Sequence, residues 1–197
     1  MPNWCNNDLH LTHDDPEMIK KARDAWESGN FLATLVPEPD YTTTPVAKAY
    51  PEISAEFAKT DEEKEKIMAN EPTIREDAWW DWRVQNWGTK WDVGYDSALG
   101  NHVQGDDKEI FVYFDSAWSP PTSAYEKLAE LGFGIRAYYF EGGCGFCGSW
   151  IDGCDDYYDI VKWKADWVRE NIPKDIDDAM FISDSIEMDE EEDEELE

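Results

Sequence analysis

The chain has 197 residues, of which 41% are hydrophobic and 14% aromatic, with 11 Trp. This length and composition predict one folded domain, or one domain with an insertion, and exclude a wholly disordered protein. The formal net charge is −29 at pH 7. Because affinity for nucleic acids depends mainly on Lys and Arg that neutralise phosphates, this charge argues against direct binding of nucleic acids or anionic membranes and favours a basic protein partner.

The location expected from the sequence is the cytoplasm. No apolar run approaches the roughly 18 residues that a membrane span needs, and residues 1–13 lack the basic and apolar regions of a signal peptide. The four cysteines stand at positions 5, 144, 147 and 154. We expect them to be reduced thiols, because the cytosol disfavours structural disulfides.

The first predicted elements are a strand and a helix. Leu9 and Leu11 alternate with polar residues, which predicts a strand with one buried face. Asp15 followed by Pro16 is typical of a helix start, and Gly29 supplies a helix stop.

The next segment, about residues 31–90, is predicted to be an insertion. Four prolines preclude a long helix in its first half, at positions 37, 39, 45 and 51. Residues 53–70 have the composition of a charged surface helix. Residues 75–87 form a Trp-rich helix in this prediction, with Trp80, Val84 and Trp87 in one stripe that packs into the core.

The second half of the domain repeats the alternation of strands and helix. The nearly continuous β-branched and aromatic run at 110–115 predicts a central strand, and residues 91–109 its antiparallel partner and turn. A helix beginning near Ser119 or Thr122 and ending at Gly132 precedes a last strand at 133–143.

The predicted order is therefore β-α-β-β-α-β, the split β-α-β pattern of ferredoxin-like folds. This is an α+β class with helices on one face of an antiparallel sheet, here with a long helical insertion between the first helix and the second strand. Residues 1–183 are expected to form the single domain. In residues 184–197, ten of fourteen side chains are Asp or Glu, which predicts a disordered acidic tail.

Five motifs resemble, in chain order, the YubB ferredoxin-like domain family: MPNWCNN, FLATLVPEP, WRVQNWGTKWD, FDSAWSPP and YYFEGGCGFCGSW. The resemblance covers about residues 1–165. It implies a ferredoxin-like fold and a protein encoded by a bacteriophage or plasmid that works in the cytoplasm of a bacterial host cell. No chemistry is established for that family, so the resemblance carries over no catalytic residue.

The residues around the central motif form the predicted functional cluster. Gly88 and its neighbours are typical of a turn, and pairing of this turn with the segment at 115–121 would shape one end of the sheet. A stacking platform for nucleic-acid bases would need more cations than this segment supplies. The predicted binding or structural cluster consists of Trp80, Arg83, Trp87, Lys90, Trp91, Asp92, Asp115 and Trp118.

A second candidate is the cysteine turn, which contains Cys144, Cys147 and Cys154. The C-x-x-C pair and a third thiol supply three ligands of a possible zinc site, but the segment lacks a fourth ligand. The glycine-rich setting is typical of a hairpin turn rather than of the helix start that activates a thiol. We therefore favour packing of unligated thiols in this turn over a metal or redox site.

The function hypothesis is a non-enzymatic accessory protein of a bacteriophage or plasmid, without cofactor, that acts through protein–protein contacts with a basic host or phage protein. In one form of this hypothesis the protein is an acidic mimic of nucleic acid, and the partner is a nucleic-acid-binding protein. The alternatives are a small metal- or thiol-dependent enzyme or regulator built around the cysteine turn, and an acidic tail that docks on basic partners by itself.

Overall fold

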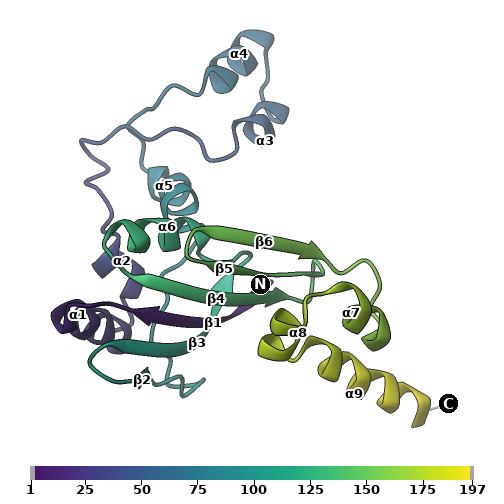
Figure 1. Cartoon of the computed structure of the whole chain (residues 1–197). Helices are drawn as coiled ribbons and strands as arrows, with labels where there is room; N and C mark the ends of the chain where they lie inside the picture. Colours follow the sequence, from purple (N-terminus) through teal and green to yellow (C-terminus); the bar gives the residue numbers. More distant parts are fainter. Residues whose placement is uncertain (1–2, 196–197) are drawn as a thin grey trace.

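A six-stranded antiparallel sheet organises the molecule (Figure 1), in the order β2-β3-β1-β4-β5-β6. The computed structural model describes residues 3–195, with side chains described to residue 191. The strands are β1 Trp4–Thr12, β2 Gln104–Gly105, β3 Glu109–Ala117, β4 Gly134–Glu141, β5 Phe146–Ile151 and β6 Cys154–Asp159. The helices are α1 Pro16–Glu27, α2 Phe31–Leu35, α3 Pro51–Glu56, α4 Asp61–Ala69, α5 Ala78–Trp87, α6 Thr122–Glu130, α7 Ala165–Asn171, α8 Lys174–Met180 and α9 Ile182–Glu195.

The predicted α+β class is confirmed. Strand β1 is followed by α1, and β3 and β4 are joined by α6, so the first four strands follow the predicted β-α-β-β-α-β order. Strands β5 and β6 then extend the sheet beyond β4. The segment that contains α2 to α5 lies between α1 and β2.

Helices α1 and α6 cover one face of the sheet. Leu9 and Leu11 on β1 are fully buried, as their alternation with polar residues predicts, and they pack with Trp26 of α1 and Leu128 of α6 in the main core. The indole nitrogen of Trp26 donates to the carbonyl of Asn101 at 3.0 Å, so even this deeply buried ring has its one donor satisfied.

A second helical group packs against the opposite face, which differs from the prediction of helices on one face only. Helix α8 contacts β1, β4 and β5. A smaller core forms there from Cys147 on β5 together with Val168, Ile176 and Ile182 of the three last helices. None of the helices within residues 3–195 combines the length and the apolar character needed to cross a membrane.

The segment predicted as a disordered tail from residue 184 is instead the helix α9, as far as Glu195; residues 196–197 lie outside the described part. Ile182 and Ile186, one helical turn apart, are both buried against the second core. Arg169 of α7 forms ion pairs with Asp184 at 3.5 Å and with Glu187 at 2.6 Å. Composition alone predicted disorder because it counts charges and misses this pair of apolar contacts.

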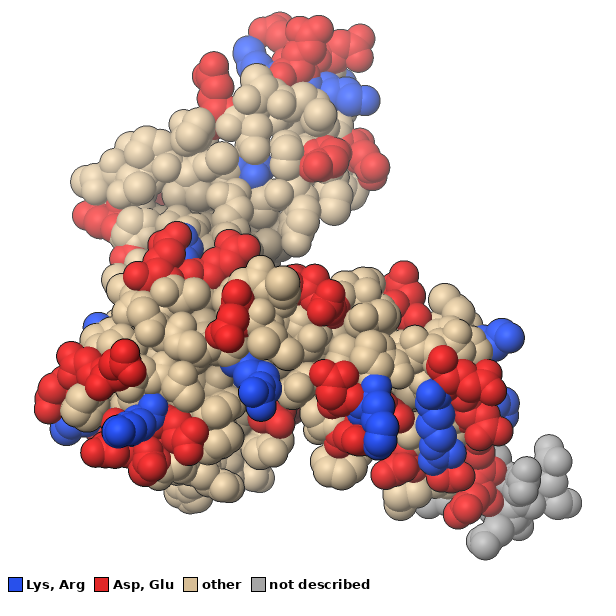
Figure 2. All heavy atoms as spheres, in the orientation of Figure 1, with Lys and Arg blue, Asp and Glu red and all other residues tan. Residues whose placement is uncertain are grey.

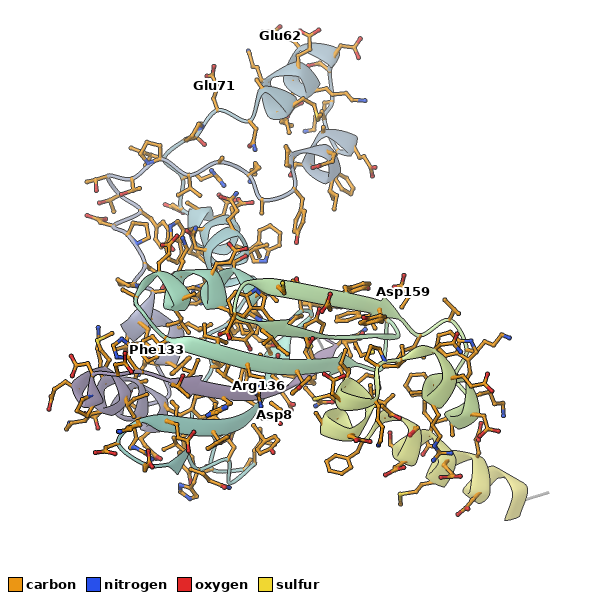
Figure 3. All side chains as sticks on the ribbon, viewed as in Figure 1. Asp8, Glu62, Glu71, Phe133, Arg136 and Asp159 are labelled. Atoms are coloured by element: carbon orange, nitrogen blue, oxygen red, sulfur yellow. The ribbon has the colours of Figure 1, made fainter. Side chains whose placement is uncertain are left out.

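The insertion forms an arm, defined here as residues 46–76, that projects away from the sheet (Figure 1). The two ends of this segment meet at a bridge between Val46 and Thr73. Beyond it, α4 has no buried residue among those described, and Figure 3 shows Glu62 and Glu71 on this arm, far from Phe133 on the body. The arm therefore derives little stability from burial.

A buried carboxylate anchors the base of the arm. Asp81 of α5 is 2% exposed and pairs with the guanidinium of Arg75. It also lies 3.4 Å from the ammonium of Lys48 and accepts the N–H of Ala49 at 2.7 Å. One side chain thus holds both ends of the arm.

The substitution Asp81→Ala is expected to release the arm while the body stays folded. Removal of a buried charged partner costs about 2 kcal/mol, which corresponds to roughly thirtyfold more of the locally open arm. Limited proteolysis with mass spectrometry should show faster cleavage within residues 46–76. The control is Asp77→Ala, because Asp77 contacts the same two cations but is 69% exposed; equal cleavage in the two variants would contradict the anchoring role.

The substitution Ile186→Ala is expected to loosen α9 by about 2–4 kcal/mol, since it removes a buried side chain of the second core. Hydrogen exchange of residues 182–191 measures this loosening. Met188→Ala on the same helix is the control, because Met188 is 65% exposed. A disordered tail would exchange fast in the unmodified protein and would respond to neither change.

Candidate functional site

The structure divides the predicted functional cluster into separate groups, of which the first links two parts of the insertion, α5 and the segment after α2. Arg83 of α5 binds Glu38 through two hydrogen bonds, of 2.7 Å from Nε and 2.8 Å from Nη2. This hydrogen-bonded guanidinium lowers the pKa of the Glu38 carboxyl. The Arg83 guanidinium also lies 4.7 Å from the ring centroid of Trp87. Because the cation has both of these partners within the chain, this group is structural.

The tryptophans of α5 do not form the predicted stripe. Trp87 is fully buried, and its indole donates to the Val36 carbonyl at 2.9 Å. Trp80 is only half-buried and lies against Tyr50 of the arm, with ring centroids 6.0 Å apart. The buried residues of the helix are instead Ala78, Asp81 and Trp87, which lie on different sides of it, so the helix is packed on more than one side.

Asp92 caps the N-terminus of α2. Its carboxylate accepts the N–H groups of Leu32, Ala33 and Val93 at 2.7, 3.0 and 2.8 Å. Burial raises the pKa of Asp92, and these three donors oppose the shift. The carboxylate thereby satisfies free N–H groups at a helix N-terminus and fixes the loop that begins after residue 91.

This loop forms one wall of a cleft of about 500 Å³ at the end of the sheet. The opposite wall is the end of β3, residues 114–117, with Trp4 of β1 beside it. Of the predicted cluster, the cleft brings together Trp91, Asp92 and Asp115. We define the edge cleft by its lining residues Trp4, Trp91, Asp92, Tyr95, Asp96, Asn101, Phe114, Asp115 and Ala117.

Exposed aromatic rings stand at the edge cleft. Trp4 is 47% exposed, and its ring centroid lies 5.8 Å from that of Trp91. The ammonium of Lys90 sits 4.9 Å from the Trp91 centroid, so this ring already binds a cation on one side. Trp118, directly after β3, is 51% exposed and has a φ of 73°. Trp4 and Trp118 are thus exposed close to one end of the sheet, with the half-buried Trp91 beside Trp4, and such a group of large rings is typical of a contact surface.

The carboxylates of the edge cleft take part in no ion pair with the described Lys and Arg side chains. Asp115 accepts a hydrogen bond of 2.7 Å from Asn6, and Asp96 accepts the N–H of Ala98. Of the ion pairs formed within the described part of the chain, none includes Asp92, Asp96 or Asp115. The edge cleft therefore concentrates negative charge next to apolar rings.

The edge cleft also contains an unfinished sheet edge. Strand β2 pairs only with Ile110 and Phe111, although β3 continues to Ala117. Two backbone carbonyls of the remaining edge accept hydrogen bonds from side chains. Asn101 donates to the carbonyl of Tyr113 at 3.0 Å, and Thr89 donates to that of Ala117 at 3.0 Å. No strand within residues 3–195 pairs with the rest of that edge.

Several residues of the edge cleft were missed by the sequence analysis. Residues 91–109 were expected to be a strand and its turn, but 91–103 form an irregular loop and only Gln104–Gly105 pair. Asp96 and Tyr95 therefore line a cleft instead of a sheet. Asp96 and Asn101, residues typical of turns, were the available signal, because their side chains bond to nearby backbone.

The cysteine turn does not bring its three thiols together. Cys144 is exposed in the turn between β4 and β5, whereas Cys147 is buried on β5. Cys147 pairs with Tyr158, four residues along β6 from Cys154, which is about 13 Å in an extended strand. Among the residues described, no three Cys, His, Asp or Glu side chains are arranged to hold a metal ion. The hairpin therefore separates the three thiols that a zinc site at this turn would need.

Two of the four thiols are expected to react with a disulfide reagent in the folded protein. Cys5 and Cys147 are fully buried, and burial raises the pKa of the Cys147 thiol to about 12 and that of Cys5 well above its usual range. Since the thiolate is the nucleophile, only about one Cys147 in 10⁴ is reactive at pH 8. Cys144 and Cys154 are exposed.

A reagent titration at pH 8 should thus count two fast thiols in the native state and four after unfolding. Cys144→Ser should reduce the fast count to one, and Cys147→Ser should leave it at two. A third fast thiol would mean that the second core is open.

Comparison with known proteins does not assign a family. No family model matches the chain, and no curated protein matches it. One similar solved structure is that of a protein api92 from Yersinia pseudotuberculosis, which carries the family name DUF1281. It is 13% identical, with 81% of this chain and 98% of that chain covered and a TM-score of 0.44. A similarity at this level carries no argument about function, so a functional assignment depends on the geometry of the edge cleft.

Proposed function

We propose that this chain is a non-enzymatic accessory protein that binds a basic protein partner at the edge cleft. The observation that carries the proposal is the absence of any Lys or Arg ion pair, among the described residues, at the three carboxylates that line the cleft. A chain with net charge −29 surrounds them with a field that attracts cations and speeds encounter with a basic surface.

The exposed aromatic rings support binding by protein rather than by free ions. Trp and Tyr are enriched at the centres of protein interfaces, where they supply apolar area with little loss of side-chain freedom. Trp4 and Trp91 offer such area beside Asp115. A partner that presents Arg or Lys next to apolar residues would satisfy both features at once.

The arm offers a second surface for contact. Ile53, Phe57, Met68 and Ile74 are all at least half exposed, with Phe57 at 79%. A 31-residue excursion that leaves most of its large apolar side chains exposed is typical of a segment that contacts a partner.

The setting of this function is proposed from the resemblance to the YubB ferredoxin-like domain family: a bacteriophage or plasmid protein in the bacterial cytoplasm. The nucleic-acid mimic remains one form of the proposal. On the face shown in Figure 2, Asp and Glu form several separate groups with other residues between them. A mimic would use such groups in place of phosphates, whereas a cleft binder needs only the carboxylates at the cleft.

Affinity capture from nuclease-treated bacterial lysate tests the proposal, with a double variant in which Asp96→Asn and Asp115→Asn remove the two charges without changing shape. We expect the unmodified chain to retain a basic protein at low salt and the double variant to bind it about tenfold more weakly. Retention should fall as salt rises from about 0.1 M to 1 M, because the screening length drops from about 10 Å to about 3 Å.

The control is the double variant Asp14→Asn and Asp107→Asn. Both residues are exposed and lie past the ends of β1 and β3 that are opposite to the cleft. Because each double variant replaces two Asp by Asn, the two variants have the same net charge. Equal losses in the two variants would mean that net charge, and not the edge cleft, determines binding. Displacement of the partner by added DNA would favour the mimic form, and a partner that DNA leaves bound would exclude it.

A further inference from the structure

The outer edge of β3 beyond β2 carries backbone groups that point into the edge cleft. In an antiparallel strand, alternate residues direct their N–H and C=O to opposite neighbours. Lys108 and Trp118 bond on the β1 side, to His13 and Asn3. The backbone N–H and C=O groups of the even-numbered residues of β3 therefore point toward β1. Those of the odd-numbered residues, including Asp115, point toward the cleft.

The register on the other side agrees with this assignment. Glu109 accepts the N–H of Asp106 in the turn that leads from β2, and Tyr113 accepts from the Asn101 side chain. Both are odd-numbered residues. The N–H of Asp115, its C=O and the N–H of Ala117 form no hydrogen bond with any group in residues 3–195. These groups belong to the part of the β3 edge that lines the cleft, where Asp115 is partly exposed and Ala117 is 2% exposed.

An open edge normally carries a cost. A row of free N–H and C=O groups is a template for pairing with another chain, and proteins cover it or keep it short. Here the chain could cover it by extending β2, but Asp92 ties the start of the loop at 91–101 to α2, and Asn101 at its other end bonds to β3 only at Tyr113. The structure therefore keeps the cleft of about 500 Å³ beside Asp115 and Ala117.

We infer that the edge cleft binds an extended basic peptide segment of the partner. The segment would pair with β3 as an added strand, on the same edge as β2 and beyond its end. This inference rests on the proposed function and gives its site and mode. The peptide backbone would bond to Asp115 and Ala117. Alternate peptide side chains point to opposite faces, so those on one face would lie over Trp4 and the carboxylate of Asp115.

The chemistry of the walls selects the side chains of the peptide. Lys and Arg pack their aliphatic stems on apolar surface and keep the charge at the end, which matches a Trp ring with a carboxylate beside it. Trp4 and Asp115 lie on the same face of the sheet, on strands that pair directly. An acidic peptide would meet Asp96 and Asp115 as like charges and be rejected.

Hydrogen exchange of backbone amides, followed by NMR on the full chain, tests this mode at single residues. The probe is an acetylated and amidated six-residue peptide that alternates Arg and Val. At saturation we expect the amides of Asp115 and Ala117 to exchange about tenfold more slowly or slower still. Those of Phe114 and Ser116 already bond to β1, so their exchange should not change; they are the internal control.

Two control peptides separate charge from backbone pairing. One alternates Glu and Val, and we expect it not to bind. The other keeps the Arg and Val sequence but carries a methyl group on every backbone amide, so that it retains the charge and cannot form a ladder; it should bind at least about tenfold more weakly. The Asp96→Asn and Asp115→Asn double variant should weaken the unmethylated peptide by a similar factor.

The outcomes distinguish this inference from the proposed function. Equal binding of methylated and unmethylated peptides, or binding without slower exchange at Asp115 and Ala117, would overturn strand addition. In that case, a basic protein captured by the unmodified chain and lost from the cleft double variant would still support the proposed function. If no basic protein depends on the cleft carboxylates and the peptide does not bind, both are wrong.

Discussion

Three hydrogen bonds to one carboxylate shape the end of the sheet where the edge cleft lies. Asp92 accepts the N–H groups of Leu32, Ala33 and Val93 and so ties the loop after α5 to the start of α2. With the loop fixed there, and with Asn101 bonded to both the loop and β3, the chain cannot run alongside the end of β3. The edge cleft is the space that this constraint leaves.

The same constraint decides which kind of function the site suits. The cleft presents an exposed Trp ring, carboxylates that form no ion pair among the described residues, and free backbone groups, and this combination fits the proposed recognition of a basic peptide. The most strongly shifted thiols, Cys5 and Cys147, have their pKa raised by burial, which suppresses reactivity. Perturbed groups can mark a functional site, but here the cause is packing in the core. A partner that supplies backbone, apolar stems and positive charge would complete the cleft.

Local sequence patterns predicted the strands and helices better than they predicted the tertiary contacts of those strands and helices. The alternation at Leu9 and Leu11 and the run at 110–115 identified two central strands, because burial of one or both faces leaves a direct mark on the sequence. The acidic composition of 184–195 concealed a helix, since its stability comes from Ile186 and from pairing with Arg169, which is distant along the chain. Composition carries no information about such partners.

The sequence by itself determined the α+β class, the order of the first strands and helices, and an acidic surface suited to basic partners, because propensity, periodicity and charge are local or summed properties. It also placed Trp91, Asp92 and Asp115 in one cluster. Only the tertiary structure decided that β2 stops after two residues, that the three thiols lie apart, and that Trp4 joins the cleft. These outcomes depend on contacts between segments far apart in the chain, where packing selects among local options that the sequence leaves equally open.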